Sequence, residues 1–285
     1  MTDTGLPAVA AWIWLLRAIT AVNVSVWLWA ARRAARRAPG QSAGERRFRR
    51  RQLALSALFV GGCAFRSILP RADVQRICLF DTWLSAVVIG RAVATVAEMA
   101  FMAQWAVLLG AWSRGTRRRL APPVSRFLVP VIGVAELCSW YAVWSTNFLG
   151  NAVEQSIWTV ASAFVLAAVA TFYRQRPRFV ATAVALMGAY LVFMAAVDVP
   201  MYLRRWRADQ RDGRVYLTFA EGVRDATVRR PVTYEWNAWR PEAVWMSLYF
   251  STGVWVSLWL GASAPAFVSS SDEKVTRNSL LRQRI

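Results

Sequence analysis

Long apolar stretches alternate with short polar connections along most of the chain. Seven of these stretches are long enough to cross a hydrocarbon core of about 30 Å, at a helical rise of about 1.5 Å per residue. They lie at approximately residues 7–31, 52–69, 83–112, 124–145, 154–173, 179–203 and 243–262. The pattern predicts an all-α fold, a polytopic transmembrane bundle of seven helices within residues 1–265. We expect the remaining tail, 266–285, to be disordered.

The basic residues between the apolar stretches predict the orientation of the bundle. The connection 32–51 holds nine arginines, and further basic residues follow the third and fifth stretches and occur in the tail. The connection 146–153 has no basic residue. Because positively charged connections stay on the cytoplasmic side, we expect a multi-pass protein of the plasma or inner membrane. Its N-terminus would lie outside and its C-terminus in the cytoplasm.

Composition agrees with a membrane protein and removes several chemistries. The chain is 56% apolar and carries a formal net charge of +19. The arginines lie in short runs between apolar stretches, so we expect a lipid bilayer as partner and no nucleic acid. The chain has no histidine, which excludes a His-ligated haem and the usual His-containing zinc sites. Its three cysteines show no metal-like spacing, and we expect neither a metal nor another cofactor.

Ionisable residues inside the apolar stretches are the main functional signal, since a charge within a bilayer is costly. Helical rise places Arg17 about 15 Å below the outer end of its stretch, Arg91 and Glu136 about 12 Å, and Asp198 about 8 Å. Such groups normally face the bundle interior and pair with one another. The expected ligand-binding or ion-pair layer therefore comprises Arg17, Arg66, Arg91, Glu98, Glu136, Glu154 and Asp198. The alternative is that one Arg–carboxylate pair only locks two helices together.

Aromatic residues follow three of these carboxylates one helical turn later. An anionic pocket with aromatic walls would suit a cation, including a quaternary ammonium group. Tryptophan and tyrosine also gather at bilayer interfaces, which leaves a simple interfacial role open. The predicted pocket wall consists of Trp140, Trp158 and Tyr202.

Two connections on the expected outer side have an unusual composition. The connection 66–81 keeps three arginines on the side that should be poor in them, which favours either an anion-binding site or an amphipathic surface helix. The connection 204–242 is long, mixed in charge and rich in Arg, Trp and Tyr, and it could be a lid or a membrane-surface anchor. Within it, residues 215–219 and 233–236 have the pattern of short strands.

Three classes of function remain open. The first is a carrier or receptor-like protein that binds, and in one version translocates, a small polar or charged ligand or a lipid headgroup through an outward-facing pocket. The second is a membrane-embedded enzyme for a lipid or lipid-linked substrate, with Glu136 and Asp198 as acid and base or with carboxylates holding Mg²⁺ or Mn²⁺. The third is a non-catalytic accessory subunit of a membrane complex. The sequence names neither the ligand nor the oligomeric state.

Overall fold

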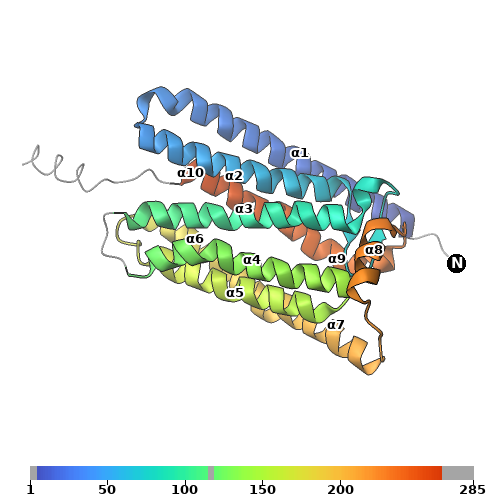
Figure 1. Cartoon of the computed structure of the whole chain (residues 1–285). Helices are drawn as coiled ribbons and strands as arrows, with labels where there is room; N and C mark the ends of the chain where they lie inside the picture. The colour runs from blue at the N-terminus through green and yellow to red at the C-terminus, as the bar shows by residue number, and fades with distance from the viewer. Residues whose placement is uncertain (1–4, 115–118, 265–285) are drawn as a thin grey trace, which may run out of the picture.

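A computed structural model describes residues 5–114 and 119–264 of the protein, and the predicted tail lies outside the described residues. The chain is nearly all helical (83%), so the predicted all-α class is confirmed. The described helices form seven rods that run side by side (Figure 1). Five of these rods are single helices, α1 (Gly5–Arg37), α2 (Ala43–Ile68), α3 (Val87–Ser113), α4 (Ala121–Ser145) and α5 (Phe148–Ala170).

The other two rods each contain a π-helical segment. The sixth consists of α6 (Pro177–Phe193), the π-helix η3 (Met194–Asp198) and α7 (Val199–Arg211). The seventh consists of α9 (Trp236–Leu248), the π-helix η4 (Tyr249–Gly253) and α10 (Val254–Ser263). Short 3₁₀ turns precede α2, at η1 (Ala38–Gly40), and α3, at η2 (Trp83–Ser85).

Six helices are long and apolar enough to cross a membrane, namely Leu6–Gly40, Val87–Ser113, Ala121–Ser145, Phe148–Ala170, Pro177–Arg211 and Trp236–Ser263. The predicted span 52–69 lies in α2, which is not among the six. Arginines crowd the first turns of α2 and Arg66 lies in its last turn, so its mean hydropathy is low. The span predicted from residue 154 begins earlier, at Phe148, because the Asn147 side chain caps the helix by accepting a hydrogen bond from the Leu149 amide (2.9 Å).

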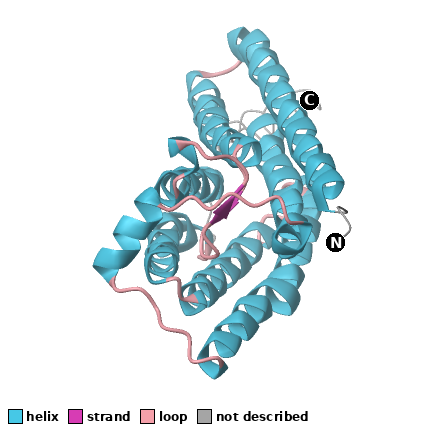
Figure 2. Cartoon of the chain, turned by 90° about the vertical axis from the view of Figure 1, so that its right-hand side faces the viewer, coloured by secondary structure: helices cyan, strands magenta, loops and turns pink. Residues whose placement is uncertain are grey.

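The two ends of the bundle differ. We call the end with the connections after α1, α3 and α5 the basic end, and the opposite end the cap end. The cap end carries a hairpin of β1 (Arg71–Ala72) and β2 (Ile77–Cys78), together with α8 (Phe219–Val228). Figure 2 looks onto the cap end and shows the hairpin in the middle of the surrounding helices.

The outer connections differ from their predicted structures. Residues 66–81 form no amphipathic surface helix, because α2 ends at Ile68 and the chain turns into the hairpin. The strand expected at 215–219 is wrong, since the Thr218 hydroxyl and the Glu221 carboxylate form a capping box that starts α8. The strand expected at 233–236 is also absent from the described residues, where Val232 makes one isolated bridge to Cys78 and α9 begins at Trp236.

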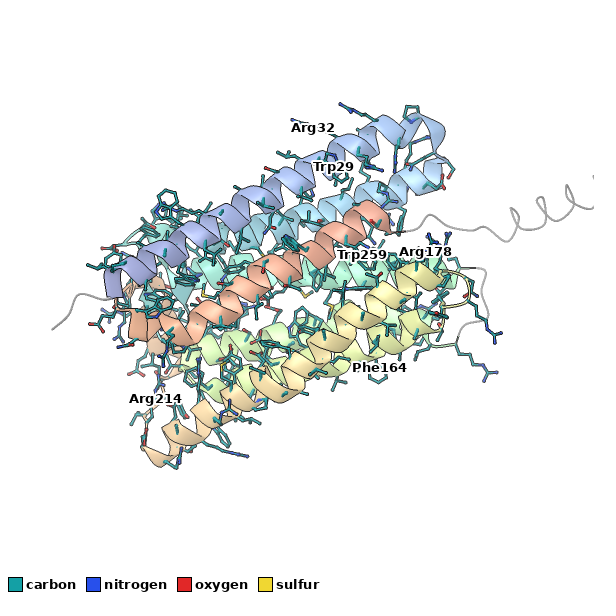
Figure 3. All side chains as sticks on the ribbon, turned by 180° about the vertical axis from the view of Figure 1, so that it is seen from behind. Trp29, Arg32, Phe164, Arg178, Arg214 and Trp259 are labelled. Atoms are coloured by element: carbon teal, nitrogen blue, oxygen red, sulfur yellow. The ribbon has the colours of Figure 1, made fainter. Side chains whose placement is uncertain are left out.

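Apolar packing divides the bundle into two parts with the site between them. One core is formed mainly by α3, α4, α5 and α6, with Phe48 of α2 and Leu260 of α10, and a second is formed mainly by α1, α2, α9 and α10, with Ala97 of α3. The rod α6–η3–α7 packs against α5, while α9–η4–α10 packs against α1 and α2. Figure 3 shows these two rods lying side by side.

Candidate ligand-binding site

Arg91 stands at the centre of a buried group of charges. Its Nη2 atom lies 2.6 Å from Oε2 of Glu98 and 2.6 Å from Oε2 of Glu136, and its Nη1 atom lies 3.8 Å from Oε1 of Glu154. We call these four residues the Arg91 cluster. Helices α3, α4 and α5 supply them, and all four are buried. One guanidinium is thus the shared ion-pair partner of three carboxylates.

Glu98 and Glu154 face a cavity, and each has one further partner. The Tyr249 hydroxyl, on the π-helix η4, donates a hydrogen bond to Oε1 of Glu98 (3.2 Å). The Asn151 amide donates to Oε2 of Glu154 (3.1 Å). Arg91, Glu98, Asn151, Glu154 and Tyr249 all line the cavity, so the charged face of the cluster is open to a ligand.

Glu136 lies on the other side of Arg91 and does not line this cavity. Its Oε2 atom accepts a hydrogen bond from the Thr95 hydroxyl (2.7 Å), which itself accepts one from the Trp140 indole (3.1 Å). Trp140 also packs against Trp144, with ring centroids 5.2 Å apart. Trp140 therefore supports Glu136 from behind and, unlike the expectation for a pocket wall, does not line the cavity.

Several buried polar atoms of the site lack a hydrogen-bond partner among the described residues. Two of them are acceptors, Oε1 of Glu136 and Oδ1 of Asn151, and one is a donor, Nε of Arg91. An unpaired polar atom costs about 1–3 kcal/mol when it is buried. The Asn151 acceptor belongs to a cavity-lining residue that is 9% exposed, so a ligand in the cavity could satisfy it.

The cavity has a volume of about 450 Å³, which is typical of a small-molecule site. Of the predicted layer, Arg66, Arg91, Glu98, Glu154 and Asp198 line it. The predicted wall residues Trp158 and Tyr202 also line it, as do further aromatic side chains. Five of the seven residues of the predicted layer thus lie around one cavity.

Arg17 lies apart from this group. It is half-buried, its guanidinium lies 5.2 Å from the ring centroid of Trp14, and it makes no ion pair within the described part of the chain. The buried face of α1 carries Trp12, Leu16 and Thr20 instead. Arg17 was assigned to the layer only from its depth along the helix. The direction of its side chain depends on the rotation of α1 about its own axis, which depth does not give.

Arg66 and the hairpin form a roof over the cap end of the cavity. Arg66 Nη2 lies 3.5 Å from Oδ2 of Asp73, and Arg71 Nε lies 2.9 Å from its Oδ1. The buried Arg71 guanidinium donates to the carbonyl oxygens of Ala86 and Val87. Burial lowers the pKa of Arg71 to about 10. These arginines are engaged within the protein, so they do not form the surface anion site that their sequence suggested.

Two more ion pairs hold the cap end together. Arg76 Nε lies 2.6 Å from Oδ2 of Asp225 and so joins the hairpin to α8. Arg205 Nη2 lies 2.9 Å from Oε1 of Glu242 and joins the sixth rod to the seventh. Gln75, at the tip of the hairpin, donates to the same Glu242 oxygen (2.7 Å).

Sequence reasoning missed Glu242, which is 3% exposed and lines the cavity. It was assigned to the outer connection because the last span was expected to start at residue 243. Helix α9 begins at Trp236, and apolar residues at 236, 239, 243 and 246 follow a helical spacing that could have revealed it. Tyr249 and Arg205 were missed because neither stands out from the pattern around it.

The three carboxylates of the cluster could also hold a metal ion. Glu98, Glu136 and Glu154 each offer an oxygen, and these atoms lie within 4.8 Å of one another. The Arg91 guanidinium now lies between them, so a metal ion would require this side chain to move.

No protein-family model, curated protein or solved structure significantly matches this chain. The chemistry of the site is therefore the basis for its function.

Proposed function

We propose that this chain crosses the membrane seven times and binds a small polar or charged ligand in the cavity beneath the hairpin. The seventh crossing is α2, whose 26 residues reach about 39 Å and which packs against α1, α3 and α10. At the basic end, residues 32–51 hold nine arginines and one carboxylate within 20 residues, whereas the cap-end connection 204–242 spreads nine arginines over 39 residues and mixes them with six carboxylates. By the positive-inside rule the cap end and the N-terminus then face outward, in the plasma or inner membrane.

The observation that carries this proposal is that Glu98 and Glu154 face a cavity inside the bundle instead of only pairing with Arg91. One Arg–Glu pair would suffice to lock two helices together. With its three carboxylates ionised and a single guanidinium, the cluster carries a net negative charge. A ligand with a cationic group would balance that charge, and the aromatic walls would attract it further.

Translocation extends the same proposal. Both rods that border the cavity contain a π-helical segment, a feature found most often at functional sites in α-helices. Movement of these rods would change access to Glu98 and Glu154. Uptake of the bound cation into liposomes that contain the purified protein tests this extension.

Binding itself is tested by thermal unfolding of the purified protein with butyltrimethylammonium, and with butanesulfonate as the anionic counterpart. We expect the cation alone to stabilise the protein, by about 2.7 kcal/mol at a concentration a hundredfold above its Kd. Glu154→Gln should remove this stabilisation. The control Glu235→Gln, at an exposed carboxylate of the cap end, should retain it. A stabilisation that is absent, or that survives in Glu154→Gln, would contradict the proposal.

The membrane-embedded enzyme remains a second candidate because of the three convergent carboxylates. If they hold a divalent ion, Mg²⁺ or Mn²⁺ should stabilise the protein and Glu136→Gln should weaken this effect. If they bind an organic cation as proposed above, the divalent ions should have no such effect.

A further inference from the structure

The cavity changes its chemistry along its length. At the cap end it is lined by polar side chains, including Arg66, Asp73 and Glu242. Farther along, beyond Arg91 and Glu98, the lining becomes apolar and comprises Met102, Trp105, Leu186, Met187 and Val256. Arg91 and Trp105 are fourteen residues apart on α3, which corresponds to about 21 Å along the helix. The cavity is therefore long, with a charged half and an apolar half.

The mouth of the cavity lies at its side. Three residues that line the cavity are also exposed, Ala189 on α6, Leu248 on α9 and Thr252 on η4. Of the hairpin residues at its cap end, Ala72 and Val74 are buried, and Asp73 and Gln75 are half-buried. The most exposed part of the lining thus lies between the sixth and seventh rods, on the side of the bundle.

The same two rods contact each other above and below this mouth. At the basic end the rings of Phe179 and Trp259 stack, with centroids 4.2 Å apart. At the cap end Arg205 and Glu242 form their ion pair. Figure 3 shows the two rods running side by side from the labelled Trp259 and Arg178 toward the cap end.

Both edges of the mouth carry a π-helical segment. In η3, Met194 and Asp198 line the cavity, and in η4 Tyr249, Thr252 and Gly253 do so. The two irregular segments of these rods thus coincide with the opening. Tyr249 connects this edge directly to the Arg91 cluster through its hydrogen bond to Glu98.

We propose that the ligand is an amphiphile with a cationic headgroup, such as a single-chain amine or quaternary ammonium compound, which enters from the bilayer between α6–η3 and η4–α10. This inference rests on the function proposed above. The headgroup would lie against Glu98 and Glu154, and an amine headgroup would in addition donate a hydrogen bond to the unpaired Asn151 acceptor, which a quaternary ammonium group cannot do. Its alkyl chain would lie toward Trp105 and Val256. A small solute from water would leave this apolar half unfilled.

A chain-length series tests the ligand class on the unmodified protein. The affinities of butyl-, hexyl- and octyltrimethylammonium are measured by thermal shift in amphipol, where no micelles take up the probes. Burial of each methylene in the apolar half should raise the affinity up to about fourfold. Octyl sulfate, which has the same chain and the opposite charge, should bind at least tenfold more weakly than octyltrimethylammonium. Affinity that is independent of chain length, or equal for the sulfate, would overturn the inference.

Two tryptophan substitutions test the lateral entry. Ala189→Trp and Thr252→Trp narrow the mouth, and the association rate of octyltrimethylammonium should fall at least tenfold. The controls Val192→Trp and Val244→Trp alter exposed positions of the same rods outside the cavity lining and should bind at the unmodified rate. Wild-type association rates in both mouth variants would overturn the lateral route.

The outcomes separate this inference from the proposed function. If butyltrimethylammonium binds in a Glu154-dependent way but longer chains add nothing, only the amphiphile inference fails. If no cation in the series binds, both fail. Because the series uses the unmodified protein, it decides the ligand class even if a tryptophan variant does not fold.

Discussion

Arg91 should be the side chain whose loss costs the bundle most. Arg91→Met keeps an unbranched apolar stem but leaves Glu98, Glu136 and Glu154 buried with no guanidinium. Arg91 is 6% exposed and Glu136 is 3% exposed, so water cannot readily replace the lost partner. Breaking a buried pair by removing one partner costs about 3–5 kcal/mol. We expect a loss of stability of this size.

The assay is a double-mutant cycle with Arg91→Met, Glu136→Gln and the combined variant, followed by unfolding of the protein in detergent. The 2.6 Å contact predicts that the two changes are coupled, because Glu136→Gln removes a carboxylate that Arg91→Met leaves unpaired. The combined variant should be no less stable than Arg91→Met alone. Arg240→Gln, at an exposed position of α9, serves as the control and should change stability by less than about 0.5 kcal/mol. Additive effects of the two cluster variants would refute the pairing.

Three further predictions concern contacts that the four cluster residues do not make. Gly90→Ala should lower stability by about 1–3 kcal/mol in thermal unfolding, because a Cβ there overlaps the Arg71 guanidinium. Gly61 has open space around it, so the control Gly61→Ala should not lower stability. Gln104→Leu should lower the stability by about 1–3 kcal/mol in the same assay, because it breaks a fully buried network of amide and hydroxyl groups between α2, α3 and α10. An unchanged unfolding midpoint would show that the network is dispensable. Hydrogen bonds from the start of α8 lower the pKa of Glu221, so its capping contribution is present at neutral pH and is lost as pH falls through this lowered pKa. Hydrogen-exchange protection of α8 should fall accordingly, and Glu221→Gln should remove this pH dependence.

The sequence was most informative where one helix determines the geometry. Arg91 and Glu98 are seven residues apart on α3, so their common face followed from helical periodicity alone. Depth along a helix also correctly suggested that Glu136 lies at the level of Arg91. The same arithmetic was misleading for Arg17, because depth gives no information about rotation around the helix axis.

The roof of the cavity could not be predicted in the same way. A buried arginine such as Arg71 is explained only by a tertiary partner, here the bare backbone at Gly90 on another helix. Glu242 was missed because we placed the start of the last span at the first uninterrupted apolar run, which begins after Glu242.

The choice between a helix lock and a ligand site turns on Glu154. Glu136 has the contacts of a lock, since it lies 2.6 Å from Arg91 and accepts a hydrogen bond from Thr95 on the side away from the cavity. Glu154 lies 3.8 Å from Arg91 and is held by one amide hydrogen bond, although it is 2% exposed. The guanidinium that attracts it is shared with two other carboxylates at shorter distance, while its burial carries the full cost of desolvation. A carboxylate so placed weakens an empty bundle, and its position on the cavity wall is explained once a cationic group lies against it.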